Sequence, residues 1–441
     1  MGESSTPDQL DLCIAVDFGA THTGVAWMSS KLEDEDIHIF RDWPEADPRE
    51  PKVPTLLAKE QTGKGTDWGF PCKHAAIEKW RGFKIFLDPN ELTMGHRSGS
   101  YHAPKDSSEV DRIVTEYLRH VYRHISVRIP DDATRASLPG EGWKDWKVCF
   151  IFSVPTTWHP EQTNHFRQLV RNAGFDQVDQ HKVVLGLTEA EAAAVAAGDL
   201  DLPIQKGDVL LTVDAGGGTT DFAFAKVAAA KPLTFESLEA EKGVARGSLT
   251  IDTEFERLLG RNLPGNAAQK VTESDGFRTV KHNFGQRDHR AEEYSLAVSK
   301  DMGDSSFGMF TLKGGHLFFK HEVMQDIFDD ILMRIAPKRT DALEMFGGSY
   351  PDNVKYVVLS GGLGGSAYVL RNFEEFFAKE GEKRECEEGD PFNGKEYVTD
   401  QIQWLIKKGT RLTVGDEFSH TIEKRLGSDD VDQEGWSEKI V

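Results

Sequence analysis

The chain has 441 residues, of which 38% are hydrophobic and nine are tryptophan, so it can bury a substantial core and is not a disordered protein. Its length exceeds what one hydrophobic core normally organises and predicts two lobes or more. With 73 acidic against 52 basic residues and a net charge of −21, it is repelled by nucleic-acid backbones and anionic membrane surfaces, so neither is an expected partner.

The cysteines do not indicate a metal site or a disulfide framework. Cys13, Cys72, Cys149 and Cys386 lie far apart in the sequence, without the paired spacing of zinc ligands. We find neither a signal peptide nor a long apolar segment. We therefore expect a reducing, cytoplasmic environment.

The first distinctive stretch is CIAVDFGATHTGVAWM, from Cys13 to Met28, which predicts a strand, a tight turn and a second strand. Asp17 enters the turn, which is made of Gly19, Ala20 and Thr21. Small residues there let backbone N–H groups approach an anionic ligand closely. An aspartate at the start of a turn can also simply cap it.

The rest of the first half is predicted to complete one lobe. A third strand is expected near Ile37 to Phe40, followed by a small insertion at about 43–105. An amphipathic helix is predicted from Asp106 to Ile129, because its apolar residues recur at helical spacing. These residues are Val110, Val114, Leu118 and Val121. Strands that alternate with helical patterns predict the α/β class.

The stretch LLTVDAGGGTTDFAFAKV, from Leu210 to Val227, repeats the first motif, with Asp214 in the place of Asp17. Glycines can turn tightly with positive φ and bring backbone N–H groups against a phosphate. The turn consists of Gly216, Gly217, Gly218 and Thr219. An ordinary hairpin explains a lone glycine triplet equally well, but the repeat predicts two half-sites that face each other across a cleft.

A third glycine-rich stretch, VKYVVLSGGLGGSAYVLRNFEEFFAK, runs from Val354 to Lys379. It predicts a strand, a glycine turn and the start of a helix. A helix N-terminus presents free N–H groups and the positive end of the helix dipole, so this element suits the phosphate or sugar of a nucleotide. Its candidate binding residues are Gly361, Gly362, Gly364 and Ser366.

With these three motifs in order, the chain resembles the actin-like ATPase superfamily, and within it divergent relatives of the seventy-kilodalton heat-shock chaperones. The resemblance covers about Leu12 to Lys379 and includes VPTLLA, from Val53 to Ala58. It implies a duplicated actin-like (ribonuclease H-like) α/β fold, with two lobes around a nucleotide cleft and an inserted subdomain in each. Lobe I would span 1–202 with its insertion at about 43–105, lobe II 203–385 with its insertion at about 246–337, and a polar, partly β-rich tail 386–441.

The resemblance also implies ATP or ADP with Mg²⁺ as cofactors. Asp17 and Asp214 would hold the Mg²⁺, a cation that takes carboxylates directly or through water. The backbones and hydroxyls of residues 19–21 and 216–219 would cradle the phosphates.

For hydrolysis the resemblance nominates four groups. Asp221 and Glu189 would orient the attacking water and Thr219 would lie near the γ-phosphate, while Lys84 would reach a phosphate. Glu189 could instead be a solvated residue at a helix start, and Lys84 a surface lysine.

Two of the places where the chain departs from the family pattern bear on its function. Ala20-Thr21 replaces consecutive hydroxyl residues, and too few residues follow Phe377 for a peptide-binding domain. The favoured function is a slowly hydrolysing, chaperone-like nucleotide switch read by a protein client or co-chaperone. A catalytically silent scaffold and a small-molecule kinase on the same fold are the alternatives.

Overall fold

The computed structural model divides into two compact units, Met1–Glu189 and Ala190–Ile440, which are described separately. It describes residues 10–29, 37–47, 50–60, 66–73, 77–98, 102–135, 142–198, 204–230, 233–237, 242–263, 267–286, 291–344, 354–375 and 403–404. Most of the expected tail, and part of the stretch between the expected lobes, lie outside the described residues.

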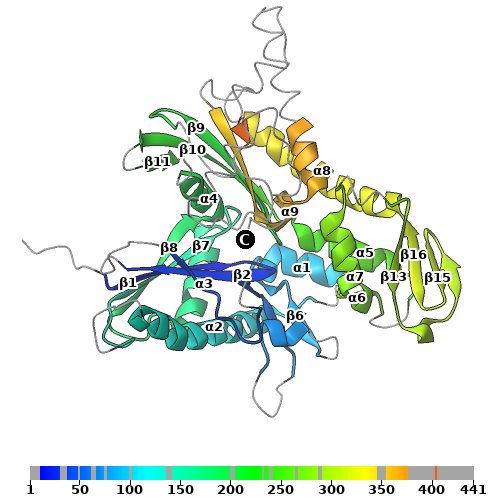
Figure 1. The fold of residues 1–441 in the computed structure, drawn as a ribbon, viewed down its shortest axis with the longest axis horizontal. Coiled ribbons are helices and arrows are strands. Elements are labelled where there is room, and N and C mark those ends of the chain that lie inside the picture. The colour runs from blue at the N-terminus through cyan, green and yellow to red at the C-terminus, as the bar shows by residue number, and fades with distance from the viewer. Residues whose placement is uncertain are drawn as a thin grey trace, which may run out of the picture. The chain divides into compact units, whose positions relative to one another are not determined.

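The first unit is built on a six-stranded sheet in the order β3-β2-β1-β7-β8, with β4 paired to β2 (Figure 1). The strands β1 and β2 form an antiparallel hairpin, and β7 and β8 continue the sheet in parallel with β1. The strands are β1 (Leu12–Phe18), β2 (His22–Met28), β3 (His38–Ile39), β4 (Lys52–Pro54), β7 (Val148–Val154) and β8 (His181–Thr188). The predicted hairpin and third strand are therefore present.

Helices α2 and α3 pack side by side and cover one face of this sheet (Figure 1). The predicted apolar face of α2 is buried, and the helix continues past the expected end at Ile129, through Pro130, to Arg135. The helices are α1 (Pro89–Ser98), α2 (Ser107–Arg135) and α3 (Pro160–Ala173), with 3-10 turns η1 (Phe70–Lys73) and η2 (Phe83–Leu87) and a small β5 (Leu56–Ala58) and β6 (Lys79–Arg81) pair. Cys13 and Cys149, distant in sequence, are register partners on β1 and β7 and are not bridged.

The second unit repeats this strand arrangement. Its main sheet has the order β11-β10-β9-β17-β18, with β12 paired to β10. Again a hairpin, β9 and β10, is antiparallel, and β17 and β18 follow in parallel with β9. The strands are β9 (Val209–Ala215), β10 (Thr220–Ala230), β11 (Leu233–Ser237), β12 (Lys242–Val244), β17 (Val354–Ser360) and β18 (Gln403–Trp404).

Between β12 and β17 the second unit holds a helical layer and a separate four-stranded sheet of order β13-β16-β15-β14, at the right of Figure 1. The helices are α5 (Ser248–Gly260), α6 (Ala267–Thr272), α7 (Asp275–Asn283) and α8 (His321–Glu344), with η4 (Lys300–Met302). The strands are β13 (Glu293–Ala297), β14 (Ser305–Phe307), β15 (Phe310–Lys313) and β16 (His316–Lys320). The short helix α9 (Gly361–Gly364) follows β17, and a further helix covers 367–375. Helix α4 (Glu189–Gly198) begins at the boundary of the two units.

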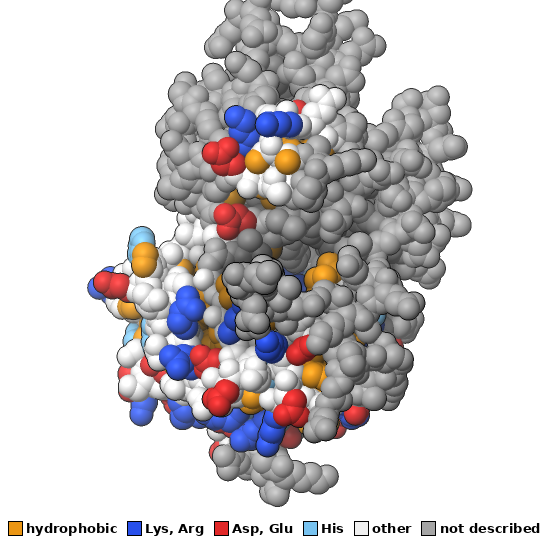
Figure 2. Space-filling model, turned by 90° about the vertical axis from the view of Figure 1, so that its left-hand side faces the viewer, with side chains coloured by type: hydrophobic (Ala, Val, Ile, Leu, Met, Phe, Trp, Pro, Cys, Tyr) orange, Lys and Arg blue, Asp and Glu red, His pale blue; other side chains and the backbone are white. Residues whose placement is uncertain are grey.

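Each unit has its own aromatic core, and the mixed α/β class is confirmed. In the first unit Phe18 stacks on Phe166, and in the second Phe255 packs against Phe277 and Phe319. On the face shown in Figure 2, acidic and basic side chains of the described residues are interspersed, as on an ordinary solvated surface. Among the helices of the described residues, none combines the length and the apolar character needed to cross a bilayer.

Candidate functional site

The turn between β1 and β2 is closed by hydrogen bonds of its own backbone. The Gly19 N–H donates to the carbonyl oxygens of Asp17 and His22. A Cβ on residue 19 would lie 2.4 Å from the His22 carbonyl oxygen, so no side chain fits there. Ala20 is buried at the tip of this turn, where the family pattern has a hydroxyl residue.

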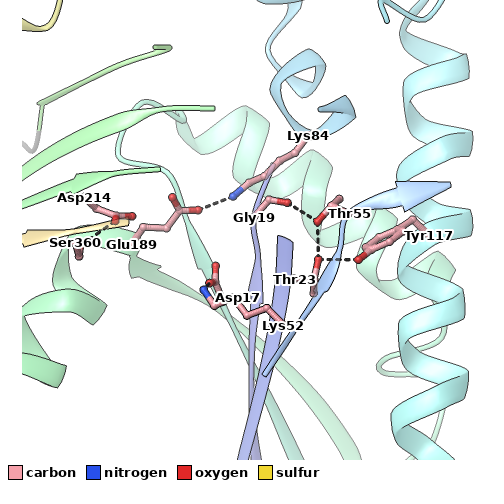
Figure 3. A network of polar contacts seen from close by, with 10 residues as sticks. All are labelled: Asp17, Gly19, Thr23, Lys52, Thr55, Lys84, Tyr117, Glu189, Asp214 and Ser360. Atoms are coloured by element: carbon pink, nitrogen blue, oxygen red, sulfur yellow. Dashed lines mark hydrogen bonds and ion pairs between the residues drawn. The ribbon is translucent and has the colours of Figure 1, made fainter. Parts of the chain in front are cut away.

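A buried hydroxyl network fixes this turn from behind (Figure 3). The Thr55 hydroxyl donates to the Gly19 carbonyl at 2.8 Å and lies 3.0 Å from the Thr23 hydroxyl. The Tyr117 hydroxyl, from α2, donates to Thr23 at 2.9 Å. Burial raises the pKa of Tyr117, so its hydroxyl stays protonated and remains a donor. Thr55 belongs to the VPTLLA stretch, which is part of the sequence resemblance. Its hydrogen bond to the glycine turn depends on the strand register and could not be predicted from the sequence.

Asp17, at the end of β1, forms an ion pair with Lys52 of β4 (Figure 3). The Lys52 Nζ lies 2.6 Å from the Asp17 Oδ2, and both side chains are nearly half exposed. Burial would raise the pKa of Asp17, but the charges of Lys52, Lys84 and His22 and the Lys52 hydrogen bond outweigh it and hold the pKa below its ordinary value. The sequence analysis did not single out Lys52 as a site residue.

Lys84 and Glu189 form a second ion pair in the first unit (Figure 3). The Lys84 Nζ lies 2.5 Å from the Glu189 Oε1, and the two side chains are only 6% and 13% exposed. The ammonium also lies 5.7 Å from the ring centroids of Phe18 and Trp158. Lys84 is therefore not a surface lysine, and Glu189 is not a solvated helix-start residue.

In the second unit, Asp214 and Asp221 are direct register partners on β9 and β10. Partners on antiparallel strands project from the same face of the sheet, so the two carboxylates come from one side. Asp221 is fully buried and Asp214 is partly exposed. Like charges in opposite positions repel, and a cation that both carboxylates approach lowers that repulsion.

The triple-glycine turn packs against the start of α5. The carbonyls of Gly216 and Gly217 accept hydrogen bonds from the N–H groups of Ser248 and Leu249, while the Gly216 N–H donates to the Thr219 carbonyl. A Cβ on residue 247 would lie 2.5 Å from the Gly217 carbonyl oxygen. The expectation of positive φ is wrong for Gly216. Gly247, the residue before α5, must therefore lack a side chain because it lies against the carbonyls of this turn.

The third motif joins the same side of the second unit. The Ser360 hydroxyl donates to the Asp214 Oδ1 at 2.8 Å (Figure 3), and the two residues are register partners on β17 and β9. Gly361 has a φ of 81°, and a Cβ there would lie 2.6 Å from the Asp214 Oδ1. The Ser366 hydroxyl is buried and has no hydrogen-bond partner among the described residues. A buried hydroxyl of this kind is a group that a ligand can satisfy.

The structure thus gathers the nominated residues into one set in each unit. The first set is Asp17, Gly19, Ala20, Thr21, Lys84 and Glu189, and the second is Asp214, the residues 216–219, Asp221 and the residues 361–366. The first set, with Lys52, offers ammonium groups to phosphate oxygens. The second offers carboxylates to a cation. Among the described residues, no cluster of three or more histidine, cysteine, aspartate or glutamate side chains could hold a metal ion.

Each unit thus carries an aspartate-bearing hairpin, and the second unit adds a strand that runs through glycines into a helix. No protein-family model matches the chain. Human heat shock 70 kDa protein 12A is 22% identical over 312 residues, which cover 56% of this chain and 45% of the relative. The mouse protein of the same name is 21% identical over the same length. The chain spans about half the length of these curated relatives, and the similarity supports a distant Hsp70-like relationship.

Proposed function

We propose that the chain binds ATP or ADP with Mg²⁺ and hydrolyses ATP slowly, as a nucleotide-dependent switch. The observation that carries this proposal is the nearly buried ion pair of Lys84 and Glu189 beside Asp17. Such a pair is costly to bury unless its geometry and surroundings compensate. The pKa of the neighbouring Asp17 is lowered by Lys52 and Lys84, and carboxyl groups with perturbed pKa values cluster at functional sites.

Each of these residues has a chemical task in the proposal. Lys84 would donate to phosphate oxygens, and Glu189, held by Lys84, would orient a water molecule for attack. Bound Mg²⁺ would neutralise phosphate charge, with Asp214 and its register partner Asp221, in place of Asp17, as its protein-side partners. Ser360 positions Asp214 by its hydrogen bond.

Glu189→Gln tests the assignment. Glutamine can still accept a hydrogen bond from Lys84, so we expect nucleotide binding to persist while ATP cleavage in a single-turnover assay falls on the order of 10²-fold. Glu191→Gln, two residues further along α4, is the matched control and should retain the wild-type rate. Equal rates in the two variants would remove Glu189 from the reaction.

A silent scaffold that binds nucleotide without cleaving it is the second candidate, and one observation favours it. Ala20 supplies a buried methyl group where a hydroxyl would contact phosphate. The scaffold candidate is supported if the wild-type protein binds Mg·ATP in calorimetry but releases no phosphate in a single-turnover assay. A protein client or co-chaperone would read the nucleotide state in either case.

A further inference from the structure

Asp17, Gly24 and Lys52 form one row across three strands of the first unit. Asp17 on β1 is the register partner of Gly24 on β2, and Gly24 is the register partner of Lys52 on β4. Register partners on antiparallel strands share a face of the sheet. The acid and the lysine therefore flank a position without a side chain.

Because Gly24 has no side chain, the Lys52 side chain can pass over it to reach Asp17. A Cβ on Gly24 would lie 3.2 Å from the Lys52 Cε, 3.3 Å from its Cγ and 3.5 Å from its Cδ. The alkyl chain of Lys52 therefore lies across β2 over Gly24, and its ammonium ends 2.6 Å from the Asp17 carboxylate. In Figure 3 the two side chains point toward each other.

The strand that carries Lys52 is anchored to the same glycine turn. The Thr55 N–H donates to the Thr21 carbonyl at 2.9 Å, and the Thr55 hydroxyl donates to the Gly19 carbonyl. The backbone of β4 and the turn are thus held as one piece. This fixes the base of the lysine close to Asp17 and limits the entropy lost when its ammonium is held there.

The equivalent acid of the second unit has different neighbours. Asp214 has Asp221 as its register partner on one side and Ser360 on the other. A divalent cation suits that pair of carboxylates. At Asp17 an ammonium from the chain itself already supplies positive charge.

We propose that Lys52 is a resident cation of Asp17, which takes the place of a divalent metal at this carboxylate and binds nucleotide phosphate from there. The Lys52 side chain is nearly half exposed, so phosphate oxygens can reach its ammonium while Asp17 holds it. The phosphate part of this inference rests on the proposed function. Its consequence is nucleotide affinity that depends only weakly on divalent cations.

The metal part is tested by titrating Mn²⁺ into the full chain and following its electron paramagnetic resonance. Every protein compared also carries Asp214→Asn. This removes the Asp214 carboxylate as an Mn²⁺ ligand, so that the signal reports Mn²⁺ bound in the first unit. We expect Lys52→Met to bind Mn²⁺ at least about fivefold more tightly than its Lys52 parent, because the competing ammonium is gone. Lys105→Met, which removes a lysine with a 75% exposed side chain, should match the parent. Equal Mn²⁺ affinity with and without Lys52 overturns the resident-cation claim.

The phosphate part is tested with a fluorescent ADP analogue, with excess Mg²⁺ or with a chelator. On going from Mg²⁺ to chelator, we expect the affinity of the wild type for the analogue to fall less than about threefold. The affinity of Lys52→Met should fall at least about tenfold, since a charge-assisted hydrogen bond is lost. Lys52→Arg should restore the wild-type behaviour. Circular dichroism confirms that each variant is folded.

The outcomes separate this inference from the function on which it rests. Wild-type protein that binds the analogue only with Mg²⁺, or Lys52→Met that matches wild type in chelator, overturns the inference and leaves the proposed function standing. Wild-type protein that binds no analogue under either condition overturns the proposed function and the phosphate role of Lys52 together.

Discussion

The ammonium of Lys84 lies 2.5 Å from the carboxylate of Glu189, although 105 residues separate them in the chain. Lys84 comes from the 3-10 turn η2, and Glu189 is the first residue of α4. Gly82, with a φ of 64°, precedes η2 and sets the direction in which the turn leaves β6. Two segments that are remote in sequence thus converge on one nearly buried charge pair.

Replacing Lys84 with methionine should destabilise the first unit. The Glu189 carboxylate would keep its nearly buried position without the ammonium, and breaking such a pair costs about 3 kcal/mol in the free energy of unfolding. Urea unfolding followed by tryptophan fluorescence measures this, because all of the nine tryptophans except Trp404 and Trp436 lie in the first unit. Lys105→Met should cost less than about 0.5 kcal/mol. Equal losses in the two variants would mean that the Lys84 pair contributes no more than a surface charge.

Gly361→Ala should disturb the Asp214 site, whereas Gly362→Ala should not. An alanine at 361 would be strained by the φ of 81° and would press its Cβ against the Ala215 carbonyl oxygen at 2.4 Å. We expect a cost of at least about 2 kcal/mol. A Cβ at 362 meets no atom within 4 Å, and alanine favours a helix over glycine. Hydrogen exchange of the β9 and β17 amides distinguishes the two, and identical protection would contradict the account.

The first unit should lose stability as the pH falls below neutrality. His124 packs against Trp43 and Trp68. Burial lowers its pKa and outweighs the hydrogen bond to the Asp42 carbonyl. The unfolded chain therefore binds this proton first, and the contribution of His124 declines as the pH drops below about 6.5.

The urea midpoint of the tryptophan signal, measured from about pH 7.5 to about pH 5.5, reports this titration. His124→Gln should flatten the slope over this interval. A wild-type midpoint that rises on acidification, or an unchanged slope in the variant, would be inconsistent with a neutral, partly buried His124.

Thr55→Val should weaken the first glycine turn. It removes the hydroxyl that donates to the Gly19 carbonyl and meets Thr23, at a cost of about 1–3 kcal/mol for buried groups left unpaired. Thr93→Val is the matched control, because its hydroxyl donates to the Pro89 carbonyl at an exposed position of α1. Thermal unfolding of both variants gives the comparison. A Thr55 variant as stable as the control would show that the network does not hold the turn.

Local sequence patterns predicted the helices and strands, but they could not predict the contacts between residues that are distant in the sequence. The aspartate-bearing hairpins and the amphipathic α2 follow from strand alternation and helical spacing, which act over a few residues. The Asp17–Lys52 pair requires the register of three strands, which no local pattern reveals. The expected helix end at Ile129 was wrong, because Ile129 is buried in the core and the helix continues through Pro130.

The turn chemistry was predicted only in part. Gly216 was expected to take positive φ, but Gly361 takes it instead, and the close approach of α5 to the turn depends on the missing side chain of Gly247. A glycine in a sequence indicates that a side chain is absent, and the reason depends on what packs against it. At these turns the neighbours come from residues far along the chain.

Isothermal titration calorimetry of ADP and of ATP into the full chain, with Mg²⁺ present, tests the central claim that this protein binds nucleotide. The account predicts saturable binding by wild type and by Lys105→Met. Lys84→Met, shown to be folded by circular dichroism, should bind at least about tenfold more weakly, because a buried ammonium that meets phosphate is lost. Wild-type protein without binding heat for either nucleotide, or a folded Lys84→Met variant with wild-type affinity, would contradict it.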